Sequence, residues 1–147
     1  MNKETRERNW KDCLLSKKAR KTNKDILRSR FLKRTSIERT NFLQNIKATE
    51  EGINFIFEGY YTSIIELMQS ITLLEGYNII NHLCLGYYLR DILKEENLFR
   101  IFDELRYKRN SIVYYGKLMK FEIANLSTKR AKILIENLKN ILHNKQW

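Results

Sequence analysis

The chain has no proline and only five glycines among its 147 residues. Proline breaks the interior of a helix and glycine weakens it, so the commonest interruptions of helical structure are almost missing. Leucine, isoleucine, lysine and glutamate are abundant, as in many helical proteins. The sequence therefore predicts an all-α protein, an up-and-down bundle of four to five helices without sheets or long loops.

A chain of this length fits a single domain, and its charge divides that domain into two segments. Residues 1–40 contain 14 Lys and Arg against 5 Asp and Glu, whereas residues 41–147 contain 14 against 12. We expect basic amphipathic helices in residues 1–47 and a core bundle in residues 48–147. A basic end of this kind attracts a polyanion, an acidic protein or an anionic membrane surface, unless it is simply solvated.

Polar residues in the basic segment argue against the membrane among these partners. A helix that binds a membrane surface combines clustered large apolar residues with a continuous cationic face. Four polar residues interrupt that cationic face: Thr22, Asn23, Thr35 and Ser36. RNA phosphates or an acidic partner protein are therefore favoured.

Apolar spacing predicts one or two helices in the basic segment and a long central helix after it. Apolar residues of the basic segment recur at spacings of three, four and seven, which predicts helices with a cationic outer face. They are Trp10, Leu14, Leu15, Ile26, Leu27, Phe31, Leu32, Ile37, Phe42, Leu43 and Ile46. The central helix is expected to begin at a Thr49 cap and end at Gly76, and to be buried on more than one side.

Three further helices are expected in the remainder of the chain. The first is short and runs from an Asn78 cap to about Leu93. The next begins after Lys94, and the last runs from a Ser127 cap to Asn144. The last helix places five apolar residues on one face: Ala131, Leu134, Leu138, Ile141 and Leu142.

Cysteine and histidine are too few and too scattered to indicate a metal or disulfide framework. Cys13 and Cys84 are the only cysteines, and His82 and His143 lie far from any ligand-spaced partner. We therefore expect no cofactor, no metal site and a reducing, cytoplasmic location. His82 is interpreted as a packed or capping residue of an apolar helix.

The sequence has neither of the two apolar segments that direct a chain to or across a membrane. The first residues are charged rather than apolar, and no run approaches the roughly 18 apolar residues of a membrane span. We expect no signal peptide and no transmembrane helix.

Four tyrosines at helical spacing in apolar surroundings are interpreted as core or dimer-seam residues: Tyr60, Tyr61, Tyr87 and Tyr88.

The segment "RNSIVYYG", residues 109–116, interrupts the apolar face of the fourth helix. That face reads Leu98, Phe102, Leu105, Arg109, Ile112, Gly116 and Met119, at spacings of four and three. A guanidinium facing a core costs several kcal/mol unless it is paired, hydrogen-bonded or open to a cleft. Arg109 therefore either forms part of a site, reaches to solvent, or pairs with an acid such as Glu66 or Glu75 of the central helix.

Polar and aromatic residues lie beside Arg109 on the same helix. Tyr107, Asn110 and Tyr114 are spaced by three and four, and Arg106 lies one turn before Asn110. Guanidinium groups suit a phosphate, ring faces suit a base, and an amide suits a hydrogen bond. This combination suits a phosphodiester. Gly116 either ends the helix or permits close approach of another backbone.

The segment "LRYKRNSIVYYG" resembles the R-N-x-x-x-H signature of HEPN domains. Its setting agrees, because "GYYTSIIELMQSITLLEGY" and "NHLCLGYYL" precede it, and the likeness spans most of residues 49–142. HEPN domains are small helical bundles that usually dimerise. Many are metal-independent ribonucleases or toxins encoded beside a nucleotidyltransferase-like antitoxin, and others only bind RNA or nucleotides.

By this resemblance Arg109 would steady the scissile phosphate and Asn110 would assist it, while Tyr114 stands where the family has its acid–base histidine. An unperturbed tyrosine has a pKa of about 10 and is a poor base at neutral pH, although it can donate a proton. Some HEPN toxins also carry a modifiable tyrosine two residues after the histidine, where this chain has Gly116. Neighbouring residues expected to bind RNA are Arg106, Tyr107, Lys108, Tyr115 and Lys117.

Three functions remain open from the sequence. The first is a dimeric, metal-independent endoribonuclease toxin that uses Arg109, Asn110 and Tyr114. The second is a non-catalytic module that binds RNA or a nucleotide. The third is a partner-binding helical protein in which Arg109 is buried at a dimer interface.

Overall fold

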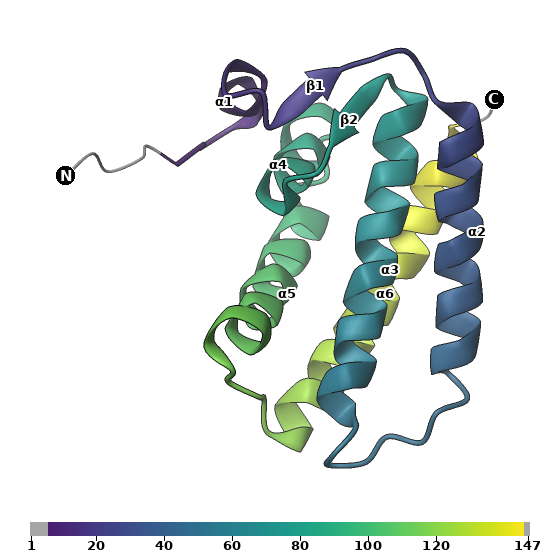
Figure 1. The fold of residues 1–147 in the computed structure, drawn as a ribbon, viewed down its shortest axis with the longest axis vertical. Helices are drawn as coiled ribbons and strands as arrows, with labels where there is room; N and C mark the ends of the chain where they lie inside the picture. Colours follow the sequence, from purple (N-terminus) through teal and green to yellow (C-terminus); the bar gives the residue numbers. More distant parts are fainter. Residues whose placement is uncertain (1–5, 146–147) are drawn as a thin grey trace.

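A computed structural model of the chain describes residues 6–145 and has an up-and-down arrangement of four long helices. α3 (Ile53–Leu74) lies at the centre of the bundle, with α2 (Ile26–Leu43) on one side and α6 (Phe121–Asn144) packed behind it (Figure 1). α5 (Glu96–Tyr115) descends on the other side. The predicted all-α bundle is confirmed.

Smaller elements cover the upper part of α5 and α3 (Figure 1). They are α1 (Trp10–Leu15), β1 (Ala19–Lys21), β2 (Tyr77–Ile79), α4 (His82–Tyr87) and a π-helical continuation of α4 (Tyr88–Ile92). Within residues 6–145, no helix combines the length and the apolar character that crossing a bilayer requires.

α3 is buried on several sides, as its sequence predicts. Phe57, Ile64, Leu67 and Ile71 are at most 1% exposed and form the middle of the core. The core also contains four tyrosines: Tyr60, Tyr61, Tyr87 and Tyr88. The prediction that they are core residues is therefore confirmed. α3 ends before Gly76, whose φ of +83° lies in the left-handed region that glycine tolerates best.

The face of α2 that packs on α3 is built largely from small polar residues, and Leu43 at the end of the helix is its one buried large apolar side chain. Ser29 and Ser36 are fully buried, and their hydroxyls bond the carbonyls of Ser70 and Ser63 at 2.8 and 3.0 Å. Small side chains allow the two backbones to approach closely, and within residues 6–145 every hydroxyl that is fully buried has a hydrogen-bond partner. The expectation that the large apolar residues of α2 face the core is therefore wrong for Leu27, Phe31 and Phe42, which are 80%, 56% and 68% exposed.

Residues 19–21 and 77–79 form a two-stranded antiparallel sheet, which corrects the expectation that the chain contains no sheet. Asn78 was expected to cap a helix but pairs with Arg20 in this sheet. The cap of α4 is instead Asn81, whose side chain accepts a hydrogen bond from the backbone N–H of Cys84 at 2.9 Å. The helix thus begins three residues later than predicted because a strand, rather than a cap, follows Gly76.

Two other predicted helix starts differ in the structure. Thr49 caps a turn through its hydroxyl, which accepts from the N–H of Gly52 at 3.1 Å, and α3 begins at Ile53. α6 begins at Phe121, so Ser127 is not a cap but a buried residue inside the helix, with its hydroxyl bonded to the carbonyl of Ile123. Serine favours caps but also satisfies its hydroxyl one turn back within a helix, and spacing alone does not separate the two cases.

Cys13 and Cys84 form a disulfide that joins α1 to α4, although no disulfide was expected. Both cysteines are fully buried. Their separation of 71 residues gives no local spacing signal, so only the fold brings them together. Disulfides are typical of oxidising compartments, so the expectation of a reducing, cytoplasmic location loses the observation on which it was based.

Substitution of Ser36 by leucine should destabilise the protein because it inserts a large side chain between α2 and α3 and removes a buried hydrogen bond. We expect the free energy of unfolding to fall by about 2 kcal/mol or more. Urea denaturation followed by circular dichroism measures this change. Arg28→Leu, an exposed position of the same helix, should change stability by less than about 0.5 kcal/mol. Equal effects of the two substitutions would contradict the packing described here.

Reduction of the disulfide should lower stability because it removes a constraint on the unfolded chain over 71 residues. We expect a loss of about 2–4 kcal/mol, measured as the difference between urea unfolding curves with and without a dithiol. Thiol titration of the unreduced, denatured protein is the direct control. Two titratable thiols in that sample would show that the disulfide had not formed.

Candidate functional site

An open cleft of about 400 Å³ lies where the start of α4, the C-terminal half of α5 and the N-terminal segment meet. Its volume is in the range of pockets that hold small ligands. The cleft is lined by Arg6, Glu7, Lys18, Ile80, Asn81, His82, Leu83, Arg106, Arg109, Asn110 and Tyr114. Four of these eleven residues are permanent cations and one is a carboxylate, so the cleft attracts anions.

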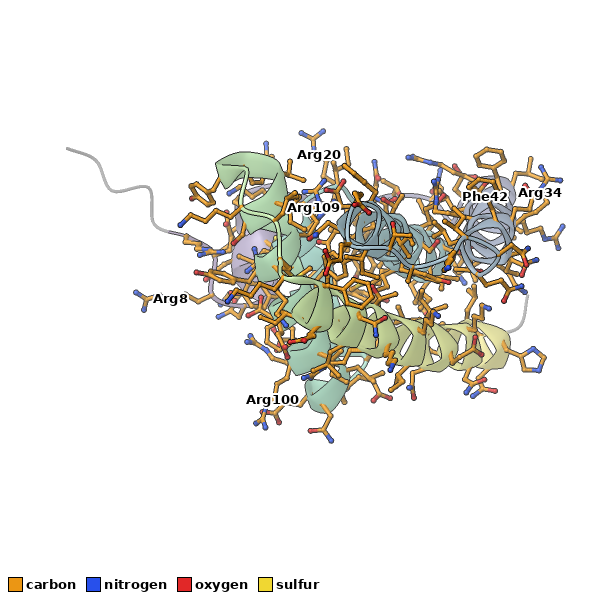
Figure 2. All side chains as sticks on the ribbon, turned by 90° about the horizontal axis from the view of Figure 1, so that it is seen from below. Arg8, Arg20, Arg34, Phe42, Arg100 and Arg109 are labelled. Atoms are coloured by element: carbon orange, nitrogen blue, oxygen red, sulfur yellow. A yellow bond between two sulfur atoms is a disulfide. The ribbon has the colours of Figure 1, made fainter. Side chains whose placement is uncertain are left out.

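Arg109 lies between α5 and α3 and is half-buried, as its position on the apolar face of α5 predicts (Figure 2). Its guanidinium carbon is 5.5 Å from the ring centroid of Tyr61 and 6.0 Å from that of Tyr114. Such cation–π contacts stabilise a guanidinium without neutralising its charge. Arg109 therefore keeps its capacity to bind an anion.

Neither of the carboxylates suggested by the sequence pairs with Arg109. Glu66 binds the guanidinium of Arg39, with 2.8 Å between Arg39 Nε and Glu66 Oε1, and Glu75 binds Lys145. In the part of the chain that the structure describes, Arg109 has no ion-pair partner. The position of Arg109 is thus explained by ring contacts and by its opening to the cleft.

Arg106 is the second arginine of α5 in the cleft, and its side chain is only 12% exposed. Asp103, one turn before it, accepts hydrogen bonds from Nε and one terminal nitrogen of Arg106 at 3.1 and 2.9 Å. This pair fixes the direction of the guanidinium and reduces its net charge. Arg109 is consequently the stronger anion-binding group of the two.

His82 lies in the same cleft, on the first turn of α4. Its Nδ1 is 2.9 Å from the hydroxyl of Tyr61, a residue of α3 that is 1% exposed. Burial, together with the charges of Arg109 and Arg106, lowers the pKa of His82 from 6.5 to about 4. The imidazole is therefore neutral at pH 7.

His82 was predicted to be a packed or capping residue of an apolar helix and not a residue of the site. It is 27 positions before Arg109 in the chain. The available signal was weak: a polar ring in the otherwise apolar run "NHLCLGYYL". Only the packing of α4 against α3 and α5 brings it to the cleft.

The N-terminal segment supplies the opposite wall of the cleft. Glu7 is buried and binds Lys18, with 3.0 Å between the nitrogen and the carboxylate oxygen. A hydrogen bond from its own backbone and the contact with Lys18 lower the pKa of Glu7. The hydroxyl of Tyr87 donates to the carbonyl of Glu7 at 2.9 Å and attaches this wall to α4.

The cleft brings together four of the residues predicted for the site: Arg106, Arg109, Asn110 and Tyr114. The other four residues predicted to bind RNA do not line it. Lys108 faces α6, where its Nζ bonds Glu104 and the hydroxyl of Ser127, each at 3.0 Å. The other three residues, Tyr107, Tyr115 and Lys117, are exposed near the end of α5.

Among the residues that the structure describes, no group of three or more His, Cys, Asp or Glu side chains could hold a metal ion. No family model, curated protein or solved structure gives a significant match to this chain.

The lowered pKa of His82 predicts that stability falls in acid. Between about pH 6.5 and 4 the unfolded chain binds a proton at His82 that the folded chain does not. The free energy of unfolding should thus decrease by up to about 3 kcal/mol as the pH falls through this window. Urea denaturation at a series of pH values, compared between wild type and His82→Gln, isolates this contribution.

The exposed His143 supplies the matched control. His143→Gln should retain the pH dependence of the wild type, while His82→Gln should lose part of it. If all three proteins lose stability equally between pH 6.5 and 4, His82 is not the group responsible.

Proposed function

We propose that this protein is an HEPN-like protein that binds RNA, with a backbone phosphate held in the cleft by Arg109. The observation that carries the proposal is the position of Arg109, which is half-buried, in contact with two tyrosine rings and open to a cleft with three more cations. Guanidinium groups bind phosphate oxygens through paired hydrogen bonds. A phosphodiester supplies the charge that this cleft lacks.

The cations of the cleft come from both of its walls. Arg106 and Arg109 belong to α5, and Arg6 and Lys18 belong to the N-terminal segment. Successive phosphates of a nucleic acid strand can contact such a surface, and each contact releases counterions. Binding that depends on several phosphates is therefore expected to weaken steeply with salt.

Exposed tyrosines beside the cleft favour an unpaired strand over a duplex. Tyr114 lines the cleft and is 69% exposed, and Tyr107 and Tyr115 on the same helix are 73% and 74% exposed. Unpaired bases stack on such rings, whereas paired bases offer no free face. Single-stranded RNA is thus the proposed ligand.

The resemblance to HEPN domains extends the proposal to metal-independent RNA cleavage, as in a toxin. In that role Asn110 would hydrogen-bond the substrate, and Tyr114 would occupy the place of the family's histidine. A homodimer and a nucleotidyltransferase-like antitoxin stay predictions of the same resemblance. The alternative is a binding module without catalysis, for which the tyrosine at position 114 is the supporting observation.

Arg109→Ala should weaken the binding of a single-stranded RNA about 10-fold or more because it removes the main phosphate-binding group. It should also reduce the slope of log K against log salt concentration by about one. Fluorescence anisotropy with a labelled oligonucleotide at several salt concentrations measures both changes. Duplex RNA of the same sequence should bind more weakly to the wild type.

Arg100→Ala is the matched control. Arg100 is also on α5, but it extends away from Arg109 on another side of the molecule, and its side chain is 71% exposed and paired with Glu96 (Figure 2). Its removal should change affinity by less than about threefold. Equal losses in the two variants would mean that binding depends on net charge and not on the cleft. Light scattering shows whether Arg109→Ala changes assembly instead.

A further inference from the structure

His82 and Tyr61 form a hydrogen-bonded pair at the edge of the cleft, outside the segment from which the site was predicted. Tyr61 is held in the core, where its ring stacks on Phe102 with 6.2 Å between centroids. Its hydroxyl reaches the Nδ1 atom of His82 at 2.9 Å. The imidazole is thus fixed by a buried anchor, and Nε2 is the ring nitrogen left for a ligand in the cleft.

We infer that His82 is the catalytic base of the proposed RNA cleavage and that Tyr61 is its positioning residue. This inference rests on the proposed function, since it requires RNA in the cleft. It assigns the reaction to a histidine of α4 rather than to the segment on α5. Tyr114 then does not have to act as the base.

The inference requires one of the two directions that the hydrogen bond between His82 Nδ1 and the Tyr61 hydroxyl permits. When Nδ1 carries the proton and donates to the Tyr61 hydroxyl oxygen, Nε2 has a free lone pair and can accept a proton. After Nε2 is protonated, the bond from Nδ1 to Tyr61 is unchanged. The ring therefore keeps its place throughout the transfer.

The charges that face His82 explain how the bound strand would activate this group. Arg106 and Arg109 face it from α5, Arg6 and Lys18 from the opposite wall, and the carboxylates of Asp103 and Glu7 are bound to Arg106 and Lys18. This excess of positive charge opposes protonation of the ring. A phosphodiester in the cleft adds a negative charge at that point, so binding of the strand raises the proton affinity of His82.

The reaction is a transesterification within the RNA strand. Nε2 of His82 takes the proton of the 2′-hydroxyl, and the 2′-oxygen forms a bond to the adjacent phosphorus. The bond from phosphorus to the 5′-oxygen breaks, and that oxygen takes a proton from the Tyr114 hydroxyl or from water. The products are a 2′,3′-cyclic phosphate and a 5′-hydroxyl, and solvent restores the proton balance of both side chains.

Arg109 has a defined part in this step. Charge on the phosphate increases as the 2′-oxygen attacks, and Arg109 lies in the cleft without a carboxylate partner in the described residues. A fixed cation next to a developing negative charge stabilises the transition state. Arg109 therefore stabilises the negative charge of the transition state, and His82 accepts the proton of the 2′-hydroxyl.

The first test measures the link between anion binding and the protonation of His82. The chain has only two histidines, His82 and His143, so imidazole NMR signals are assigned with the His143→Gln variant. Sulfate, which keeps its charge between pH 4 and 8, serves as the probe, and chloride at equal ionic strength is the control. We expect the pKa of His82 to rise by about one pH unit in sulfate, and that of His143 to change far less.

The nitrogen shifts in the same spectra report the tautomer. Above its pKa, His82 should carry its proton on Nδ1. A proton on Nε2, or a pKa of His82 that is the same in sulfate and chloride, overturns the inference.

The second test compares RNA binding and cleavage in the same samples. We expect His82→Gln to cleave RNA about 100-fold or more slowly than the wild type, in excess chelator, and to bind it with an affinity within about threefold. Tyr61→Phe keeps the buried ring and should slow cleavage about 10-fold. The pH dependence of the cleavage rate should also differ between Tyr61→Phe and the wild type. A purely structural role of Tyr61 would not cause this difference. His143→Gln should match the wild type.

The outcomes separate this inference from the proposed function. Cleavage by His82→Gln at the wild-type rate overturns the role of His82 and leaves RNA binding intact. Binding of RNA by the wild type without a cyclic-phosphate product also overturns it. If the wild type does not bind RNA, the proposed function fails and this inference fails with it.

Discussion

The burial of α3 is the constraint on which the rest of the structure depends. A helix with apolar residues on several sides must be covered on all of them, and α2, α5 and α6 do so together with α4. Tyr61 is one of the residues that this arrangement buries. Because Tyr61 contacts Arg109 and His82 by its ring and its hydroxyl, the packing of the core sets the positions of both cleft residues.

The sequence predicted those features that follow from periodicity within one helix. The apolar spacing of α3 and α6 and the place of Arg109 among the core positions of α5 were all readable without the fold. Gly116 also has the positive φ of 62° that its place at the end of α5 indicates. In each case the relevant neighbours are three or four residues away, so helix geometry alone is sufficient.

Features that depend on distant parts of the chain were missed. The disulfide, the two-stranded sheet and the presence of His82 in the cleft each join segments that are far apart in the sequence. α2 was misread for a different reason: Ser36 was interpreted as a polar interruption of the cationic face, but Ser36 and Ser29 form hydrogen bonds with α3. Small hydroxyl side chains that bond a neighbouring backbone leave no apolar periodicity to detect.

The disulfide sets the mechanical behaviour of the cleft. Cys84 is two residues after His82, and Cys13 belongs to the wall that carries Glu7 and Lys18. The two sides are therefore covalently joined near their base, and one cannot swing outward without pulling the first turn of α4 with it. The crosslink thus restricts how far the two walls can separate near Cys13 and Cys84, and its reduction would release that restraint.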